Sequence, residues 1–175
     1  VGGLLSSTNY ELYVREICGR GDTSIWIGPV NFATTCVLST LPFNEGFSAN
    51  FPICWTRTNS ADVFTTAACG GSTNESLQIF GVPGSYAESP PIDITGASVV
   101  DVKYLYRKGF SSDCGETADN GDNINVEYWD GSAWNVVHNY DGSTAPTVFT
   151  PDSFTVNVSS FTGPFKIRFF YVQGS

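Results

Sequence analysis

Few residues of this chain could serve in catalysis. His138 is the single histidine, and it lies in the run Trp134–Tyr140, where it is in phase with Val136. Since alternate residues of a strand share one face, we interpret His138 as a strand residue at or near a packed face. The sequence has no G-x-S-x-G, H-E-x-x-H or phosphate-binding glycine loop. We therefore predict that the protein is not an enzyme.

Polar and aromatic side chains could instead form a ligand-binding face. If the valine face of Asn123–Trp129 is the core, Glu127 and Trp129 point the other way. The same alternation places four bases opposite the apolar positions of their runs: Lys103, Arg107, Lys166 and Arg168. Sugars stack on indole faces beside polar groups. We expect one polar face suited to an acidic or sulfated polysaccharide; the alternative is an ordinary solvated sheet face. We expect Trp55 and Trp134 to lie in the core.

An acidic segment, residues 113–122, supplies the oxygen ligands that Ca²⁺ prefers. It reads DCGETADNGD and contains the carboxylates of Asp113, Glu116, Asp119 and Asp122. Calcium takes six to eight oxygen ligands, and this segment lacks the EF-hand spacing. A structural calcium ion and a solvated loop are the two alternatives.

Composition points to an extracellular protein. Charged residues make up 14% of the 175 residues and the net charge is −9, which disfavours nucleic acid and anionic membranes as partners. No apolar run is long enough to insert in a membrane. There is no methionine and no signal peptide, so we expect an excised piece of a secreted or cell-surface protein.

The elements that would position these residues are strands. Seven runs alternate with period two and are bounded by Gly, Pro, Asn, Asp or Ser: residues 10–17, 29–35, 99–106, 123–129, 134–140, 154–158 and 165–171. Asp130-Gly131 between two of them predicts a hairpin. Many short strands predict an all-β fold, an antiparallel sandwich or a barrel.

Two family resemblances refine this prediction. Residues 1–36 resemble the last two strands of a fibronectin type III domain, through YELYVREICG and GPVNFATT. Residues 37–175 resemble a MAM-like jelly-roll β-sandwich, as found in animal adhesion proteins and secreted bacterial multidomain proteins. That resemblance is carried by LPFNEGFS, Cys54-Trp55, SLQIFG, SPPIDITG, YLYRKGF, NVEYWDGSAWNVV and GPFKIRFFY. Such domains usually close with an acidic D-x-W-x-I-D-D strand, which we expect to be missing here.

The resemblance also implies site residues and cross-links. Related jelly rolls often hold a structural calcium, and FNEGF places Glu45 where they have an acidic residue. Related domains pair cysteines at the positions of Cys36 and Cys54. Cys69 with Cys114 is the second expected pair. These pairings would leave Cys18 unpaired within this chain.

The expected function is binding outside the cell. The first hypothesis is a carbohydrate-binding accessory module, suggested by the predicted polar face. The alternative is a protein-binding adhesion or assembly module, in which a sheet edge exchanges strands with a neighbouring chain.

Overall fold

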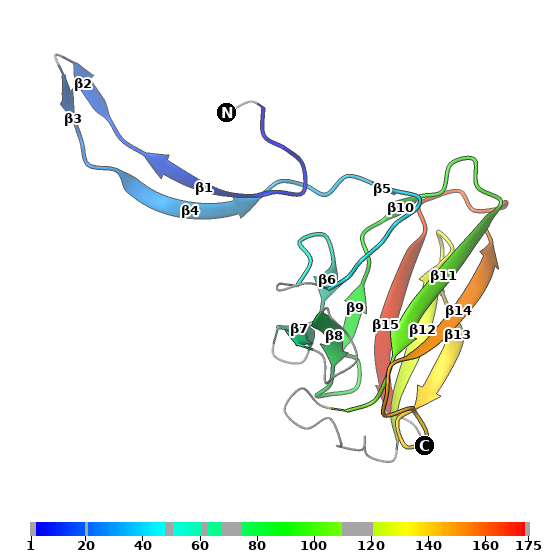
Figure 1. Ribbon diagram of the computed structural model, residues 1–175. Helices are drawn as coiled ribbons and strands as arrows, with labels where there is room; N and C mark the ends of the chain where they lie inside the picture. The colour runs from blue at the N-terminus through cyan, green and yellow to red at the C-terminus, as the bar shows by residue number, and fades with distance from the viewer. Residues whose placement is uncertain are drawn as a thin grey trace. The chain divides into compact units, whose positions relative to one another are not determined.

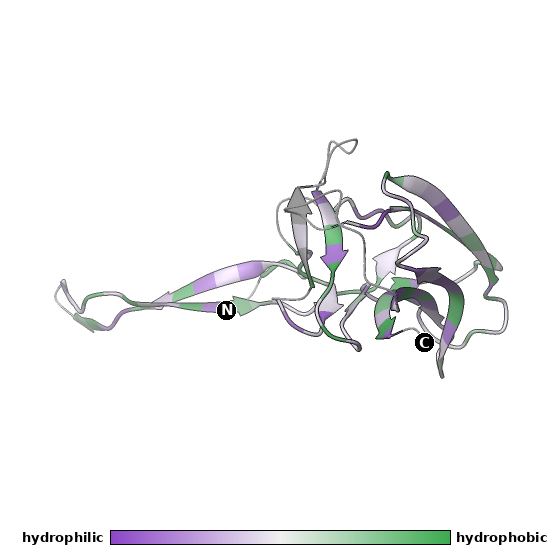
Figure 2. Ribbon diagram, turned by 90° about the horizontal axis from the view of Figure 1, so that it is seen from below, coloured by the Kyte–Doolittle hydropathy of each residue, from purple (hydrophilic) through white to green (hydrophobic). Residues whose placement is uncertain are grey.

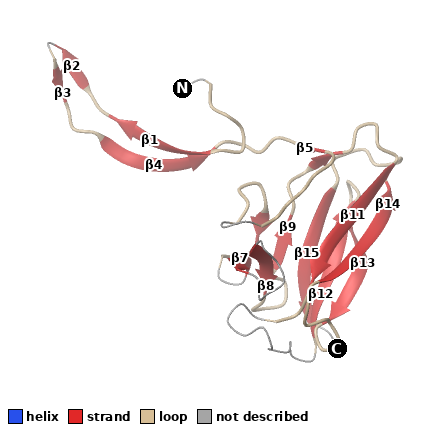
Figure 3. Cartoon of the chain, viewed as in Figure 1, coloured by secondary structure: helices blue, strands red, loops and turns tan. Residues whose placement is uncertain are grey.

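The computed structural model describes residues 3–19, 21–47, 51–60, 63–67, 75–109 and 121–173. These residues form strands, turns and loops but no helix, so the all-β prediction is confirmed (Figure 3). None of them builds a helix that could cross a membrane. The chain divides into two compact units, Val1–Val37 and Leu38–Ser175.

The first unit consists of paired strands. β1 (Asn9–Val14) pairs antiparallel with β4 (Ile27–Ala33), and β2 (Ile17–Gly19) pairs with β3 (Asp22–Thr23). Tyr10 lies opposite Phe32 and their rings stack, with centroids 5.7 Å apart. None of the buried core residues of the described chain belongs to this unit.

The second unit is built around a five-stranded antiparallel sheet, visible in Figure 1. Its strand order is β13-β12-β15-β9-β6. The strands are β6 (Thr56–Arg57), β9 (Tyr86–Glu88), β12 (Asp122–Trp129), β13 (Trp134–Asp141) and β15 (Lys166–Gln173). Strands distant in sequence are therefore neighbours, since β15 lies between β12 and β9.

Three further strand pairs complete this unit. β11 (Val99–Tyr106) pairs antiparallel with β14 (Thr150–Asn157), and β7 (Val63–Ala67) pairs antiparallel with β8 (Glu75–Ile79). β5 (Ser39–Thr40) and β10 (Ile92–Asp93) form a short parallel pair. Figure 2 shows apolar and polar residues interspersed along the strands, as expected for sheets with one buried face.

The core lies between β11–β14 and the five-stranded sheet. Val100 of β11 and Val156 of β14 cluster with the fully buried Phe165, and Ile167 of β15 packs against them. A second cluster joins Trp55, Val63 and Ala87. The prediction that Trp55 is a core residue is confirmed, since it is 6% exposed. Two layers of antiparallel sheet thus share an apolar interior.

The structure agrees with most of the predicted runs. Residues 99–106 are strand β11 at the predicted bounds, and the hairpin predicted at Asp130-Gly131 joins β12 to β13. The predicted run 10–17 is divided between β1 and β2. The alternation did not reveal the two-residue strands β5 and β10, nor β7 and β8, which contain five residues each.

The cysteine predictions have two outcomes. The Cys36–Cys54 disulfide is confirmed, and it is consistent with an extracellular location. Cys18 is a free, exposed cysteine. Cys69 and Cys114 lie outside the described residues, so their pairing stays a prediction.

Candidate ligand-binding face

Alternation along four strands builds the candidate site on the sheet face that points away from the core. Val126 of β12 and Ile167 and Phe169 of β15 face the interior. Their neighbours therefore face outward. We call this set the outer face: Tyr86, Glu88, Asn125, Glu127, Trp129, Trp134, Asn139, Lys166, Arg168 and Phe170.

Strand register arranges the outer face in three rows that cross the sheet. One row is Trp134, Trp129 and Lys166, on β13, β12 and β15. The middle row is Glu127, Arg168 and Glu88, on β12, β15 and β9. The third row is Asn139, Asn125, Phe170 and Tyr86. Aromatic residues therefore flank a central charged row on both sides.

The more buried ion pair of the outer face joins Arg168 to Glu127. The Arg168 Nε lies 2.8 Å from Glu127 Oε2, and a second guanidinium N–H donates to the same oxygen. Asn125 Nδ2 donates to the other carboxylate oxygen over 3.2 Å. Glu127 is only 4% exposed, so its charge needs these partners. The prediction placed Glu127 on an exposed face, whereas the long side chains around it cover it.

Aromatic rings enclose the two cations of the outer face. The Arg168 guanidinium carbon lies 4.2 Å from the Trp134 ring centroid and 4.6 Å from that of Phe170. Lys166 Nζ lies 5.7 Å from the Trp129 ring and 5.5 Å from the Trp134 ring, and it forms an ion pair with Glu88. These cation–π contacts hold the indoles in place.

The prediction that Trp134 belongs to the core is wrong. Trp134 lies opposite Trp129, with ring centroids 5.5 Å apart, on the outer face. The cause is a β-bulge in β13: Glu127 pairs with Val136, but Val126 pairs with His138. The extra residue shifts the alternation of side chains along β13 by one position. Alternate residues that would share one face of a regular strand therefore point to opposite faces before and after the bulge.

His138 lies beyond the bulge and packs against the other layer. Its ring lies 6.5 Å from Tyr104 and 6.0 Å from Phe154, which agrees with its interpretation as a residue at a packed face. Tyr140 donates a 2.5 Å hydrogen bond to Asp152, so the Tyr104 hydroxyl, 2.6 Å away, donates to Tyr140. Burial raises the pKa of Tyr104 to about 12, and the Tyr140 bond lowers the pKa of Asp152.

Lys103 and Arg107 do not join the outer face. Lys103 is exposed on β11, whose Val100 and Val102 pack toward the five-stranded sheet, so its side chain points to the opposite side of the unit. Arg107 follows the end of β11 and donates from Nε to the Lys108 carbonyl over 2.9 Å. The expectation of a single polar face that includes all four bases is therefore wrong.

The loop at the tryptophan end of the outer face is tightly ordered. Asp130 Oδ1 accepts hydrogen bonds from Ala133 N (2.8 Å) and Ser132 N (2.7 Å), and Asn135 Nδ2 donates to Oδ2 (2.9 Å). These bonds, the Ala133 N–H foremost, hold the pKa of Asp130 well below its usual range. Gly131 supplies the positive φ of 102° that the turn requires. The loop thus fixes Trp129 and Trp134 as neighbours.

The calcium prediction stays a prediction. Asp113, Glu116 and Asp119 lie outside the described residues. Glu45 Oε1 accepts the Phe47 N–H over 2.8 Å, and Asp122 accepts the Tyr171 hydroxyl. Within the described ranges, no three acidic, histidine or cysteine side chains gather as a metal site.

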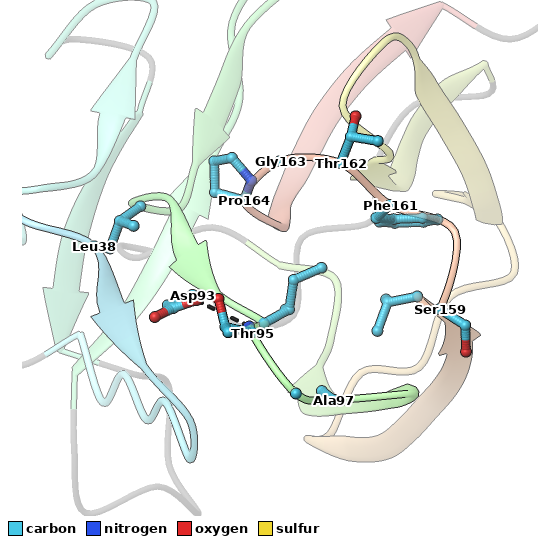
Figure 4. A pocket seen from close by; sticks show the side chains of 12 residues that line it. Leu38, Asp93, Thr95, Ala97, Ser159, Phe161, Thr162, Gly163 and Pro164 are labelled. Carbon is cyan, nitrogen blue, oxygen red and sulfur yellow. Dashed lines mark hydrogen bonds between the residues drawn. The ribbon is translucent and has the colours of Figure 1, made fainter.

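The turns after β10 and β14 line a hollow of about 380 Å³ (Figure 4), and none of the outer-face residues contributes to its lining. Its lining includes Asp93, Thr95, Ser159 and Phe161. The Asp93 carboxylate accepts the Thr95 N–H over 2.9 Å. None of the predicted ligand residues lines this hollow.

Comparisons with protein-family models, with curated proteins and with solved structures found no match.

Proposed function

We propose that the protein is a non-catalytic extracellular module that binds carbohydrate on the outer face of its five-stranded sheet. The observation that carries this proposal is the pair of partly buried indoles, Trp129 and Trp134, beside the charged middle row. Pyranose rings stack on such surfaces through their C–H groups, and flanking carboxylates and amides bind sugar hydroxyls. The resemblance of residues 37–175 to a MAM-like jelly roll, found in secreted multidomain proteins, supports the same proposal.

The outer face is long enough for several sugar units. Lys166, in the tryptophan row, and Phe170, in the opposite row, are four residues apart on β15. At about 3.4 Å per residue, these two rows are about 14 Å apart along the strand. An oligosaccharide lying along β15 would contact the indoles at one end and Phe170 and Tyr86 at the other.

Retention on immobilised or insoluble polysaccharides tests this function. The protein is expected to be depleted from solution by at least one of cellulose, xylan, laminarin, alginate or chondroitin sulfate. Trp129→Ala and Trp134→Ala should each weaken retention, by roughly tenfold for the loss of one stacking ring. Trp26→Ala is the matched control, because Trp26 is a 57% exposed tryptophan in the first unit. Equal retention of all three variants would overturn the proposal.

The first unit supports a second candidate function, protein adhesion or assembly. Of 20 exposed large hydrophobic residues in the described chain, 12 belong to the first unit. On the β1–β4 hairpin, which resembles the end of a fibronectin type III domain, Leu12 and Val30 lie opposite each other and are 39% and 60% exposed. Exposed apolar patches favour association. Sedimentation velocity tests this candidate: a monomer at all concentrations would contradict self-association, and a Leu12→Ser/Val30→Ser variant should dissociate any oligomer.

A further inference from the structure

The charges of the outer face cancel one another. Two cations, Lys166 and Arg168, are paired with two carboxylates, Glu88 and Glu127, so the four side chains sum to zero. The register places Arg168 directly between Glu127 and Glu88. The two predicted bases that lie on the outer face are therefore already neutralised by the protein itself.

These carboxylates are parts of the sheet rather than mobile counter-ions. Glu127 is 4% exposed and is held by Arg168 and Asn125. The Arg168 guanidinium is covered by Trp134 and Phe170, and its side chain is 17% exposed. An anionic sugar could reach the guanidinium only by displacing a buried carboxylate, which is costly. The net charge of −9 adds a general repulsion of polyanions.

The aromatic residues at the two ends of the face keep part of their surface exposed, and an uncharged ligand could stack there. Stacking on Trp129 requires no cation, and the Glu88 carboxylate can accept hydroxyl hydrogens while keeping its ion pair with Lys166. The side chain of Glu88 is 17% exposed and that of Lys166 25% exposed, so this pair borders solvent.

We infer that Glu88 and Glu127 determine the charge specificity of the face: by neutralising Lys166 and Arg168, they restrict it to uncharged glycans. This inference rests on the proposed carbohydrate-binding function and proposes an uncharged ligand in place of the expected acidic or sulfated one. The ion pairs act as positioning groups that hold the indoles, while stacking and neutral hydrogen bonds provide the binding.

Depletion assays at low and at physiological ionic strength test this inference with the whole chain. Cellulose, xylan and laminarin serve as uncharged probes, and alginate and chondroitin sulfate serve as anionic probes. We expect retention on an uncharged probe that changes by less than about twofold with salt, because charge screening does not affect stacking. Salt-sensitive retention on the anionic probes alone would overturn the inference and leave the carbohydrate function standing. Retention on no probe would overturn both.

Glu88→Gln tests the role of a single carboxylate. This substitution removes the counter-charge of Lys166 and leaves the more buried Glu127–Arg168 ion pair intact. We expect retention on alginate at low ionic strength to rise at least about threefold relative to Glu11→Gln, the effect of one added surface ion pair. Glu11→Gln is the matched control, since it changes the net charge equally in the first unit. A folded Glu88→Gln variant that gains nothing over Glu11→Gln would overturn the assignment to Glu88. If Glu88→Gln does not fold, the salt dependence of the unaltered chain still decides the inference.

Discussion

Replacing Glu127 by glutamine tests how the outer face is held together. The variant keeps the size of the side chain but leaves the Arg168 guanidinium, 17% exposed between Trp134 and Phe170, without its counter-charge. Two hydrogen bonds that now join the guanidinium to a carboxylate oxygen would join it to an uncharged amide instead. Removing one partner of a buried ion pair costs about 3–5 kcal/mol. Because Arg168 keeps some access to water, we expect the lower end, about 3 kcal/mol.

Urea unfolding followed by tryptophan fluorescence measures this loss. A loss of about 3 kcal/mol corresponds to a fall of roughly 10 °C in Tm for a unit of this size. The double variant Glu127→Gln/Arg168→Met removes both charges and keeps an apolar side chain under the rings. It should recover most of the lost stability, because no unpaired charge remains. A loss below about 1 kcal/mol in the single variant, or a double variant less stable than the single one, would refute the reasoning.

Three other predictions concern the framework that supports this face. Phe165→Ala should lower the free energy of unfolding by about 3–5 kcal/mol, because Phe165 is fully buried. Urea unfolding measures this loss, and a loss under about 1 kcal/mol would contradict the central place of Phe165 in the core. Cys36→Ser/Cys54→Ser should lower it by about 3 kcal/mol through loop-closure entropy, and equal urea midpoints for variant and parent would contradict this. The pKa of Asp130 is depressed in the folded protein, so its contribution is present above the unfolded pKa, near 3.8, and is lost as pH falls through the lower folded pKa. Asp130→Asn should therefore be less stable than the parent at pH 7 and nearly equal to it in strong acid, and a pH-independent difference in urea midpoint would show that the carboxylate has no such role.

The sequence predicted what local alternation determines. Residues 99–106 alternate between apolar and polar types, and they form β11 with alternating exposed and inward positions. The same pattern placed Trp129, Lys166 and Arg168 on one face of their strands, and the structure brings them together. Each of these predictions needs only the period-two geometry of a strand.

The predictions failed where the answer depends on pairing between distant segments. Trp134 changes sides because of a bulge opposite Val126 and Glu127, which the sequence of β13 alone does not reveal. The alternation of side chains along β11 does not show which of the two layers this strand joins. Lys103 was therefore assigned to a face that it does not share. β5 and β10 pair in parallel over two residues each, too short for a periodic pattern. The neutralisation of the bases also depends on β9 lying beside β15.

Indole resonances give the most direct test of the claim that the outer face binds carbohydrate. The chain has four tryptophans, and each contributes one Nε1–H signal to a ¹H–¹⁵N spectrum. Titration with cellohexaose, xylohexaose and laminarihexaose is expected to shift the signals of Trp129 and Trp134 with at least one of these sugars. The signals of the buried Trp55 and of Trp26 in the first unit should stay in place. Binding that leaves Trp129 and Trp134 unshifted, or the absence of any shift with all three sugars, would contradict the claim.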